Sequence, residues 1–199
     1  MITVINYKLN NLRSIENTLR RLGHDVLVTS SPEDVKNAEK LILPGVGAFR
    51  DAMANLRQLG LIDPFIEKVN SGTPTLGICL GMHLLFTESE EFGLHRGLDL
   101  LGGRILRIPE GVHVPHMGWN QLQIKYDDPF VHGVEPGSFV YFVHSYYALP
   151  QSSDVIVATT DHGIDFPAIV HYRNIWATQF HPEKSQKVGE RLLDNFARL

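Results

Sequence analysis

Residues 77–86 of the chain read GICLGMHLLF, and they contain the only cysteine among 199 residues. The apolar run from Thr75 to Ile78 predicts a buried strand, and the spacing of the apolar residues after it predicts a helix from about Met82. Cys79 then lies in a sharp turn between strand and helix, with a glycine two positions away on each side. This order is the cysteine version of the nucleophile elbow, in which a tight turn presents a reactive side chain above the edge of a sheet.

The residues before this stretch alternate short β-branched runs with amphipathic segments, a pattern typical of parallel strands joined by helices. The residues after it are mostly short apolar runs separated by Gly, Pro and Asp turns, which indicates antiparallel strands. The predicted strands are 1–6, 25–29, 40–43, 75–78, 104–108, 121–124, 139–143, 155–160, 168–171 and 175–179. The predicted helices are 12–22, 48–59, 63–69, 82 onward and 186–197, with a turn at 30–32. The pattern contains no repeat or linker, so it predicts one α/β domain with a mixed sheet.

The composition excludes several classes of protein. A formal net charge of −4 and a pI near 6.2 give no electrostatic reason to expect nucleic acid or an anionic membrane as partner. A lone cysteine forms no internal disulfide, and no apolar run approaches the roughly 20 residues that cross a bilayer. We therefore expect a cytoplasmic protein whose partner is a small molecule or another protein. Metal-binding motifs are missing too, so we expect no metal and no other cofactor.

The lone thiol itself has two interpretations. Free cysteine is among the most buried residue types, so Cys79 can be purely structural. The strand, turn and helix around it favour a nucleophile instead, because the unpaired amides and the dipole at a helix N-terminus lower the pKa of a thiol. A cysteine nucleophile also requires a histidine base, an acceptor that orients this histidine, and amide donors for the tetrahedral intermediate.

The stretch ATQFHPEKS supplies a candidate base. Its apolar run ends at His181, and Glu183 follows two residues later. In an extended segment residues i and i+2 project to the same side, so Glu183 is placed to bind one ring nitrogen while the other faces Cys79. The alternative interpretation is a strand end at the surface with a solvated glutamate.

The stretch LILPGVGAF supplies candidate oxyanion donors. It places Pro44 to Gly47 between a strand and a helix, where bare backbone amides can point at developing negative charge. The competing interpretation is a phosphate site for a nucleotide. It is the weaker one, because the dinucleotide fingerprint requires glycine where Arg50 stands, and the sequence has no P-loop lysine pattern.

These motifs resemble those of the class I, or triad, glutamine amidotransferases, with G-I-C-L-G as the nucleophile elbow and H-P-E as the rest of the triad. Over nearly the whole chain, the sequence also resembles the glutaminase subunits of imidazole glycerol phosphate synthases. This resemblance rests on PHMGWN at 115–120, YFVHSYY at 141–147 and QFHPEKS at 179–185. It implies a flavodoxin-like open mixed sheet with helices on both faces, mostly parallel in the first half and extended by antiparallel strands in the second, in a single domain of residues 1–199.

The resemblance also implies a function and a partner. Glutamine is hydrolysed to glutamate and ammonia, without a cofactor. The ammonia passes to a separate cyclase subunit with a (β/α)8-barrel fold, and the two subunits form a heterodimer. The cyclase uses it in histidine biosynthesis to release imidazole glycerol phosphate and an aminoimidazole carboxamide ribonucleotide.

The resemblance further assigns roles to individual residues. Cys79 attacks the side-chain amide of glutamine through a thioester, His181 takes and returns the proton, and Glu183 orients His181. The remaining assignments are the amides of Val46 or Gly47 and of Leu80 for the oxyanion; Glu91, Ser145 and Tyr146 for the α-amino and α-carboxylate ends of glutamine; and Pro115, Met117, Trp119 and Asn120 for the partner interface.

The sequence departs from the family at two places. Position 83 is usually a glutamine whose amide helps to bind the substrate, whereas here it is His83, so we expect weaker glutamine binding. The family's glycines near the N-terminus are replaced at Lys8 and Asn10 in the loop 6–11, which the family places near the partner. Three alternatives therefore stay open: the glutaminase subunit of a different synthase, such as a sugar amidotransferase; a stand-alone cysteine hydrolase acting on γ-glutamyl or peptide bonds; and a non-catalytic interaction module.

Overall fold

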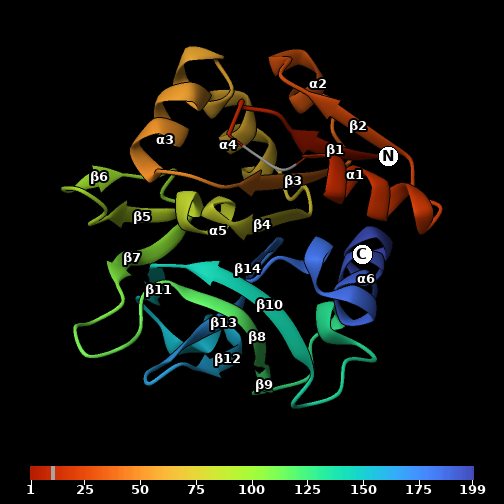
Figure 1. Cartoon of the computed structure of the whole chain (residues 1–199). Coiled ribbons are helices and arrows are strands. Elements are labelled where there is room, and N and C mark those ends of the chain that lie inside the picture. The colour runs from red at the N-terminus through yellow and green to blue at the C-terminus, as the bar shows by residue number, and fades with distance from the viewer. Residues whose placement is uncertain (10–11) are drawn as a thin grey trace.

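The computed structural model describes residues 1–9 and 12–199 and is built around one central sheet (Figure 1). This 8-stranded sheet has the order β2-β1-β3-β4-β14-β13-β12-β9. The strands, in that order, are Val26–Thr29, Ile2–Ile5, Lys40–Gly45, Thr75–Cys79, Ile175–Thr178, Asp165–Tyr172, Ile156–Asp161 and Gln123–Ile124. The chain therefore has the α/β architecture with a mixed sheet that its sequence pattern predicts.

The central sheet is parallel over most of its strands and becomes antiparallel among strands from the second half of the chain. Strands β2, β1, β3, β4 and β14 run parallel, whereas β13, β12 and β9 are antiparallel to their neighbours. The strand β14 pairs with β4 so that Thr178 lies opposite Ile78. Because the carboxyl ends of parallel strands meet at one edge, the residues after β4 and after β14 are brought together there.

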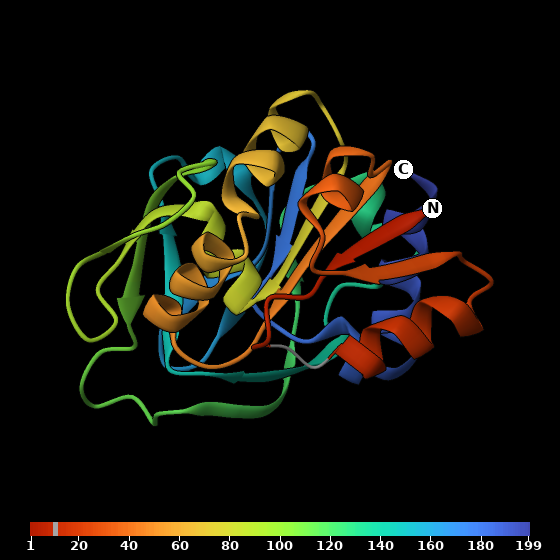
Figure 2. The ribbon, with the colours of Figure 1, turned by 90° about the horizontal axis from the view of Figure 1, so that it is seen from above.

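Helices cover both faces of this sheet. Figure 2 shows α3 and α4 on one side of it and α1 and α6 on the other. The buried apolar side chains form two clusters, which correspond to these two sets of helices. One includes Leu19 of α1 and Phe196 of α6, and the other includes Phe49 of α3 and Phe65 of α4. The helices are α1 Leu12–Arg21, α2 Pro32–Lys36, α3 Phe49–Gln58, α4 Ile62–Asn70, α5 Leu80–Leu85 and α6 Gln186–Arg198. No helix in the described ranges is long and apolar enough to span a membrane.

Two smaller sheets complete the fold. One pairs β10 with β8, and the other has the order β11-β7-β5-β6. Their strands are Phe139–His144 and His116–Gln121, then Tyr146–Pro150, Leu101–Arg107, Phe86–Ser89 and His95–Arg96. Only Ser145 separates β10 from β11, so a sharp turn joins the two small sheets.

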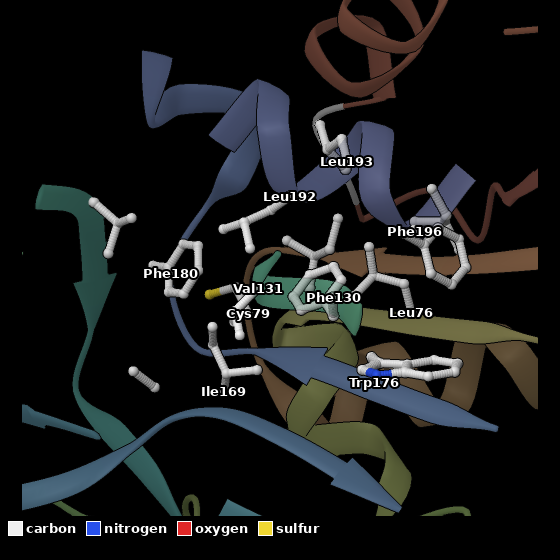
Figure 3. Close-up of a cluster of buried hydrophobic side chains, with 14 of the residues drawn as sticks. Leu76, Cys79, Phe130, Val131, Ile169, Trp176, Phe180, Leu192, Leu193 and Phe196 are labelled. Atoms are coloured by element: carbon white, nitrogen blue, oxygen red, sulfur yellow. The ribbon is translucent and has the colours of Figure 1, made fainter. Parts of the chain in front are cut away.

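Figure 3 shows how the elbow cysteine borders the core between the central sheet and α6. Leu192, Leu193 and Phe196 of α6 pack with Trp176 of β14 in the cluster that also contains Cys79. Burying side chains of this size stabilises the fold by about 1.5–3 kcal/mol each. The backbone that carries Cys79 is therefore held by the core.

Three predicted features of the chain were wrong in detail. Residues 30–32 do not form a simple turn, because α2 begins at Pro32 and Ser31 caps it by accepting a hydrogen bond from the Asp34 amide. The helix after Cys79 begins at Leu80, two residues before the predicted start. The strands β5, β6, β8 and β11 were largely missed. Strands β5, β8 and β11 pair with strands that are not their neighbours in the chain, and β6 is a two-residue edge strand that pairs only with β5.

Candidate active site

Cys79 occupies a strained turn between β4 and α5. Its φ of +54° and ψ of −111° fall outside the regions that L residues ordinarily adopt, a conformation that costs about 1–3 kcal/mol. The flanking glycines are required for a different reason. A Cβ atom on Gly81 would lie 1.7 Å from the Leu43 carbonyl oxygen, and one on Gly77 would lie 2.7 Å from Cδ1 of Leu85. Glycine therefore lets α5 pack directly on β3 and β4, which holds the cysteine in place.

His181 and Glu183 form a buried pair just after β14. Nδ1 of His181 donates a hydrogen bond to Oε1 of Glu183 at 2.8 Å, and the side chains are 2% and 1% exposed. The backbone of His181 is held as well, by the Tyr141 carbonyl and by the hydroxyl of Ser185. The predicted pairing of positions i and i+2 is present, but a 3-10 turn at Pro182–Lys184, rather than an extended segment, produces it.

The second ring nitrogen of His181 is left for the cysteine. Nε2 is buried and has no hydrogen-bond partner of ordinary geometry among the described residues, while Sγ of Cys79 contacts the Val143 carbonyl at 3.9 Å. Burial alone would lower the pKa of His181, but the interactions with Cys79 and then with Glu183 raise this pKa to about 10. The site thus favours a protonated imidazole beside the sulfur. Catalytic hydrogen bonds commonly tighten only when the substrate binds.

A cavity of about 520 Å³ opens in front of Cys79 and His181. Its size is typical of small-molecule sites. The structure brings to it all the residues that the resemblance assigns to oxyanion and substrate binding, which are Val46, Gly47, Leu80, His83, Glu91, Ser145 and Tyr146. Glu183 does not line the cavity and lies behind His181.

The candidate oxyanion donors are not equally available. The Val46 amide donates to the Leu9 carbonyl at 3.1 Å, so it is not free to face the cavity. Gly47 has a φ of +98°, a conformation that suits glycine. Leu80 is the first residue of α5, and amides in the first turn of a helix have no intrahelical partner.

Glu91 and His83 differ from each other in charge. Oε2 of Glu91 accepts a hydrogen bond from the Phe49 amide at 2.7 Å, and burial raises the pKa of this carboxyl. Nε2 of His83 contacts Oε1 of Gln179 at 2.8 Å and acts as the donor, since the amide oxygen only accepts. Burial lowers the pKa of His83 to about 4, so its ring is neutral and Nδ1 can only accept. A glutamine at this position would instead offer an N–H donor.

Four residues that line the cavity were missed by the sequence analysis: Phe92, Arg107, and Val143 and His144 at the end of β10. Arg107, at the end of β7, pairs in register with Tyr146 and forms no ion pair with a residue that the structure describes. Phe92 lies at the rim with 84% of its surface exposed and a φ of +54°. Arg107 does not stand in any motif that the sequence analysis used, whereas Val143 and His144 lie in the quoted stretch YFVHSYY but were not assigned a role. Only the pairing of β7 with β11, which are far apart in the chain, brings Arg107 to the site.

The residues assigned to the partner interface lie away from the cavity. Met117 and Trp119 of β8 are 67% and 46% exposed, Pro115 precedes this strand and is exposed, and Asn120 is half-buried. In the N-terminal loop, Lys8 adopts a φ of +74°, which explains why glycine suits this position in the family. Asn10, the other replaced glycine, lies outside the described residues, as does Asn11.

A cysteine elbow, a histidine–carboxylate pair and a glycine loop at one edge of a mixed α/β sheet define a cysteine-dependent amidotransferase site. The model of the family described as "Glutamine amidotransferase class-I" matches residues 3–199. The chain belongs to this family. Solved structures with the same fold include a "glutamine amidotransferase" with a TM-score of 0.79, which covers 100% of both chains at 20% identity. PurLQS from Thermotoga maritima matches with a TM-score of 0.78 at 19% identity, over 99% of this chain and 97% of that one.

Other proteins are about 50% identical to the chain, far more than these solved structures, and they share one name. The protein named "Imidazole glycerol phosphate synthase subunit HisH" of Syntrophotalea carbinolica is 51% identical, over 98% of both chains. The protein of the same name from Geobacter metallireducens is 52% identical, over 98% of this chain and 97% of its own. The protein of the same name from Geobacter sulfurreducens is 50% identical, over 100% of this chain and 98% of its own.

Proposed function

We propose that the chain is the glutaminase subunit of an imidazole glycerol phosphate synthase and acts in histidine biosynthesis. One observation carries this proposal: Cys79 and the His181–Glu183 pair meet at a cavity lined by each predicted substrate contact, in a chain about half identical to HisH proteins. The chain works as a single domain of residues 1–199 in the cytoplasm. It passes ammonia to a cyclase subunit, which makes imidazole glycerol phosphate and an aminoimidazole carboxamide ribonucleotide.

The chemistry follows from the charge states at the site. Sγ of Cys79 attacks the side-chain carbonyl carbon of glutamine, and the C–N bond breaks as protonated His181 gives its proton to the departing ammonia. His181 then takes a proton from water, which attacks the thioester and releases glutamate and the thiolate. Glu183 stabilises the protonated ring through Nδ1 at both steps.

Two charged side chains that line the cavity suit the zwitterionic end of glutamine. Glu91 supplies a carboxylate for the α-ammonium group, and Arg107, which no described carboxylate pairs with, supplies a guanidinium for the α-carboxylate. Ser145 and Tyr146 lie beside Arg107, since Tyr146 is its register partner and Ser145 accepts a hydrogen bond from the Ile108 amide. Charged hydrogen bonds of this kind contribute about 1.5–3 kcal/mol each.

The oxyanion loop gives a physical reason for low activity in the isolated chain. The Val46 amide is engaged by Leu9, so the Val46 peptide must turn before it can donate to the tetrahedral intermediate. Loss of one oxyanion donor typically lowers kcat by about 10²–10³-fold. We expect binding of the partner to favour the turned peptide.

The partner is a cyclase subunit with a (β/α)8-barrel fold, and the assembly is a heterodimer. Its contact surface includes Pro115, Met117, Trp119 and Asn120. The exposure of Met117 and Trp119 supports this assignment, because large exposed apolar side chains that gather on one face commonly mark protein interfaces.

The decisive experiment mixes the purified chain with a cyclase subunit and the cyclase's ribonucleotide substrate. We expect glutamate release to be slow for the chain alone and strongly stimulated in the mixture, with glutamine-dependent formation of imidazole glycerol phosphate. The control Cys79→Ala should abolish the glutamine-dependent reaction while added ammonia still supports the cyclase. Fast turnover without a partner would instead favour a stand-alone hydrolase.

A further inference from the structure

The two strands β8 and β10 present different side chains on their two faces. The outer face carries Met117 and Trp119, whereas the inner face carries His116 and His144, which are direct partners in the register and only 4% and 7% exposed. Two buried histidines beside each other are costly to desolvate unless each ring nitrogen has a partner. The hydrogen bonds around them therefore decide what this inner face can do.

Three consecutive contacts connect Asn120 of β8 to the turn that follows β10. Nδ2 of Asn120 lies 3.2 Å from Nε2 of His116, and Nδ1 of His116 lies 3.0 Å from Nε2 of His144. Nδ1 of His144 lies 2.8 Å from the carbonyl oxygen of Tyr146. The last contact spans Ser145, so it closes the sharp turn between β10 and β11.

Backbone groups at the two ends fix the direction of every hydrogen bond in this row. The Asn120 amide nitrogen also donates to the Asp161 carbonyl at 2.8 Å, and Oδ1 of Asn120 accepts from the Gln121 amide at 2.8 Å, so the orientation of the side-chain amide is settled. At the other end the Tyr146 carbonyl can only accept, so Nδ1 of His144 carries a proton.

The proton position on one ring then fixes the donor and acceptor of the next hydrogen bond in the row. With a proton on Nδ1, a neutral His144 accepts at Nε2, so Nδ1 of His116 must donate to it. A neutral His116 in turn accepts at Nε2 from Asn120. A proton added to Nε2 of either ring would set two donors against each other.

The surroundings keep both rings neutral. Burial lowers the pKa of His116 to about 4, and the neighbouring His162 adds to this effect. Burial likewise lowers the pKa of His144 well below its usual value, with further contributions from His116, His83 and His162. His162 stacks on the His116 ring with centroids 4.0 Å apart, but its Nε2 donates a hydrogen bond outside this row, to the His113 carbonyl. Phe142 and Phe166 pack against the same rings.

We propose that Asn120, His116 and His144 are positioning residues that form a hydrogen-bonded chain of single polarity and fix the Ser145–Tyr146 turn against bound glutamine. This inference rests on the proposed glutaminase function, because Ser145 and Tyr146 are its substrate contacts. This row of hydrogen bonds has a donor, the Asn120 side-chain amide, at one end and a backbone acceptor at the other. Replacing a single donor by an acceptor therefore breaks it. Because the row joins β8 to the Ser145–Tyr146 turn, a movement of β8 also moves this turn.

The first test reads the tautomers in the unaltered chain. Nitrogen NMR of the histidine rings at neutral pH should show both His116 and His144 neutral, with the proton on Nδ1. A proton on Nε2 of either ring overturns the chain of single polarity, whatever any variant does.

The second test replaces the donor at the Asn120 end of the row by an acceptor. Asn120→Asp puts an acceptor against an acceptor at Nε2 of His116, so the nitrogen signals of His116 should change and the KM for glutamine should rise about fivefold, the effect of one lost hydrogen bond, with kcat little altered. His116→Gln, which removes the ring that connects the two ends, should raise the KM similarly. Both are measured in the complex with the cyclase subunit.

The matched control is His162→Phe, which keeps an aromatic ring stacked on His116 and leaves the row intact. We expect its KM and its histidine tautomers to be unchanged. An active native complex in which folded Asn120→Asp or His116→Gln retains the native KM contradicts the positioning role. A native complex that does not hydrolyse glutamine contradicts the proposed function instead.

Discussion

The two walls of the cavity are built in different ways. The wall that carries Cys79 is held by backbone packing, since Gly81 lets α5 rest directly on the Leu43 carbonyl. The wall that carries His181 and the Ser145 turn is held by side-chain hydrogen bonds, such as the one from Nδ1 of His181 to Glu183. The comparison teaches that the nucleophile is positioned by close packing, whereas the base and the substrate contacts depend on the charge and direction of individual hydrogen bonds. Variants should therefore disturb the two walls differently.

The largest effect is expected on the hydrogen-bonded wall. Glu183→Gln keeps an oxygen near Nδ1 of His181 but removes the buried charge that stabilises the protonated ring. We expect kcat for glutamine hydrolysis in the complex to fall about 10²–10⁴-fold with the fold intact, as for other uncharged replacements of a triad carboxylate. Steady-state kinetics and circular dichroism measure this.

The control for this variant is Glu190→Gln, which removes the charge of a surface ion pair with Arg21 and should leave kcat unchanged. If Glu183→Gln kept near-native kcat, orientation by Glu183 would not be part of the mechanism.

The same contrast explains what could be read from the sequence. The elbow around Cys79 and the glycine loop before α3 are local patterns, so their fold and their likeness to the family were visible in short stretches. Arg107 was missed because it reaches the cavity only through the pairing of β7 with β11. The Asn120–His116–His144 row depends on the register of β8 and β10. Non-local pairing leaves no signature in a short segment, which is why Arg107 and this row were missed, whereas the His181–Glu183 pair of the same wall lies within one short stretch and was predicted.

The packed wall should respond through stability. In Gly81→Ala the added methyl group would overlap the Leu43 carbonyl, which cannot move without displacing β3. We expect a loss of about 3 kcal/mol or more in the free energy of unfolding, measured by urea denaturation. The control is Gly102→Ala, because the nearest atom there belongs to the flexible Gln151 side chain. Equal stability of the two variants would contradict positioning by close packing.

Acid should reveal the neutral histidine buried on the packed wall. The folded-state pKa of His83, about 4, lies below its unfolded value near 6.5, so the unfolded chain binds more protons in between. Stability is therefore fully present above about pH 6.5 and is lost as the pH falls through 4, by up to about 3 kcal/mol for this group. His83→Gln should flatten that decline in urea midpoints between pH 7 and 4, whereas His132→Gln at the surface should not.

Arg107 tests the charged end of the hydrogen-bonded wall. Arg107→Gln removes a guanidinium that no described carboxylate pairs with, so the KM for glutamine should rise about tenfold or more while stability hardly changes. Glutamine α-amide, which lacks the carboxylate, should be a poor substrate for the native complex and should lose nothing further in the variant. Arg104→Gln is the control, since its ion pair with Glu90 is exposed. A native KM in Arg107→Gln would assign the α-carboxylate to the backbone of the turn alone.

The smallest effect concerns His83, the side chain of the packed wall besides Cys79 that we place in contact with the substrate. His83 uses Nε2 on Gln179 and offers only an acceptor at Nδ1, whereas glutamine at this position supplies an amide donor. His83→Gln should therefore lower the KM for glutamine by about twofold to tenfold, the worth of one hydrogen bond, with kcat unchanged because the elbow does not move. An unaltered KM in the complex would mean that this wall contributes the nucleophile and the oxyanion donors but no substrate contact from position 83.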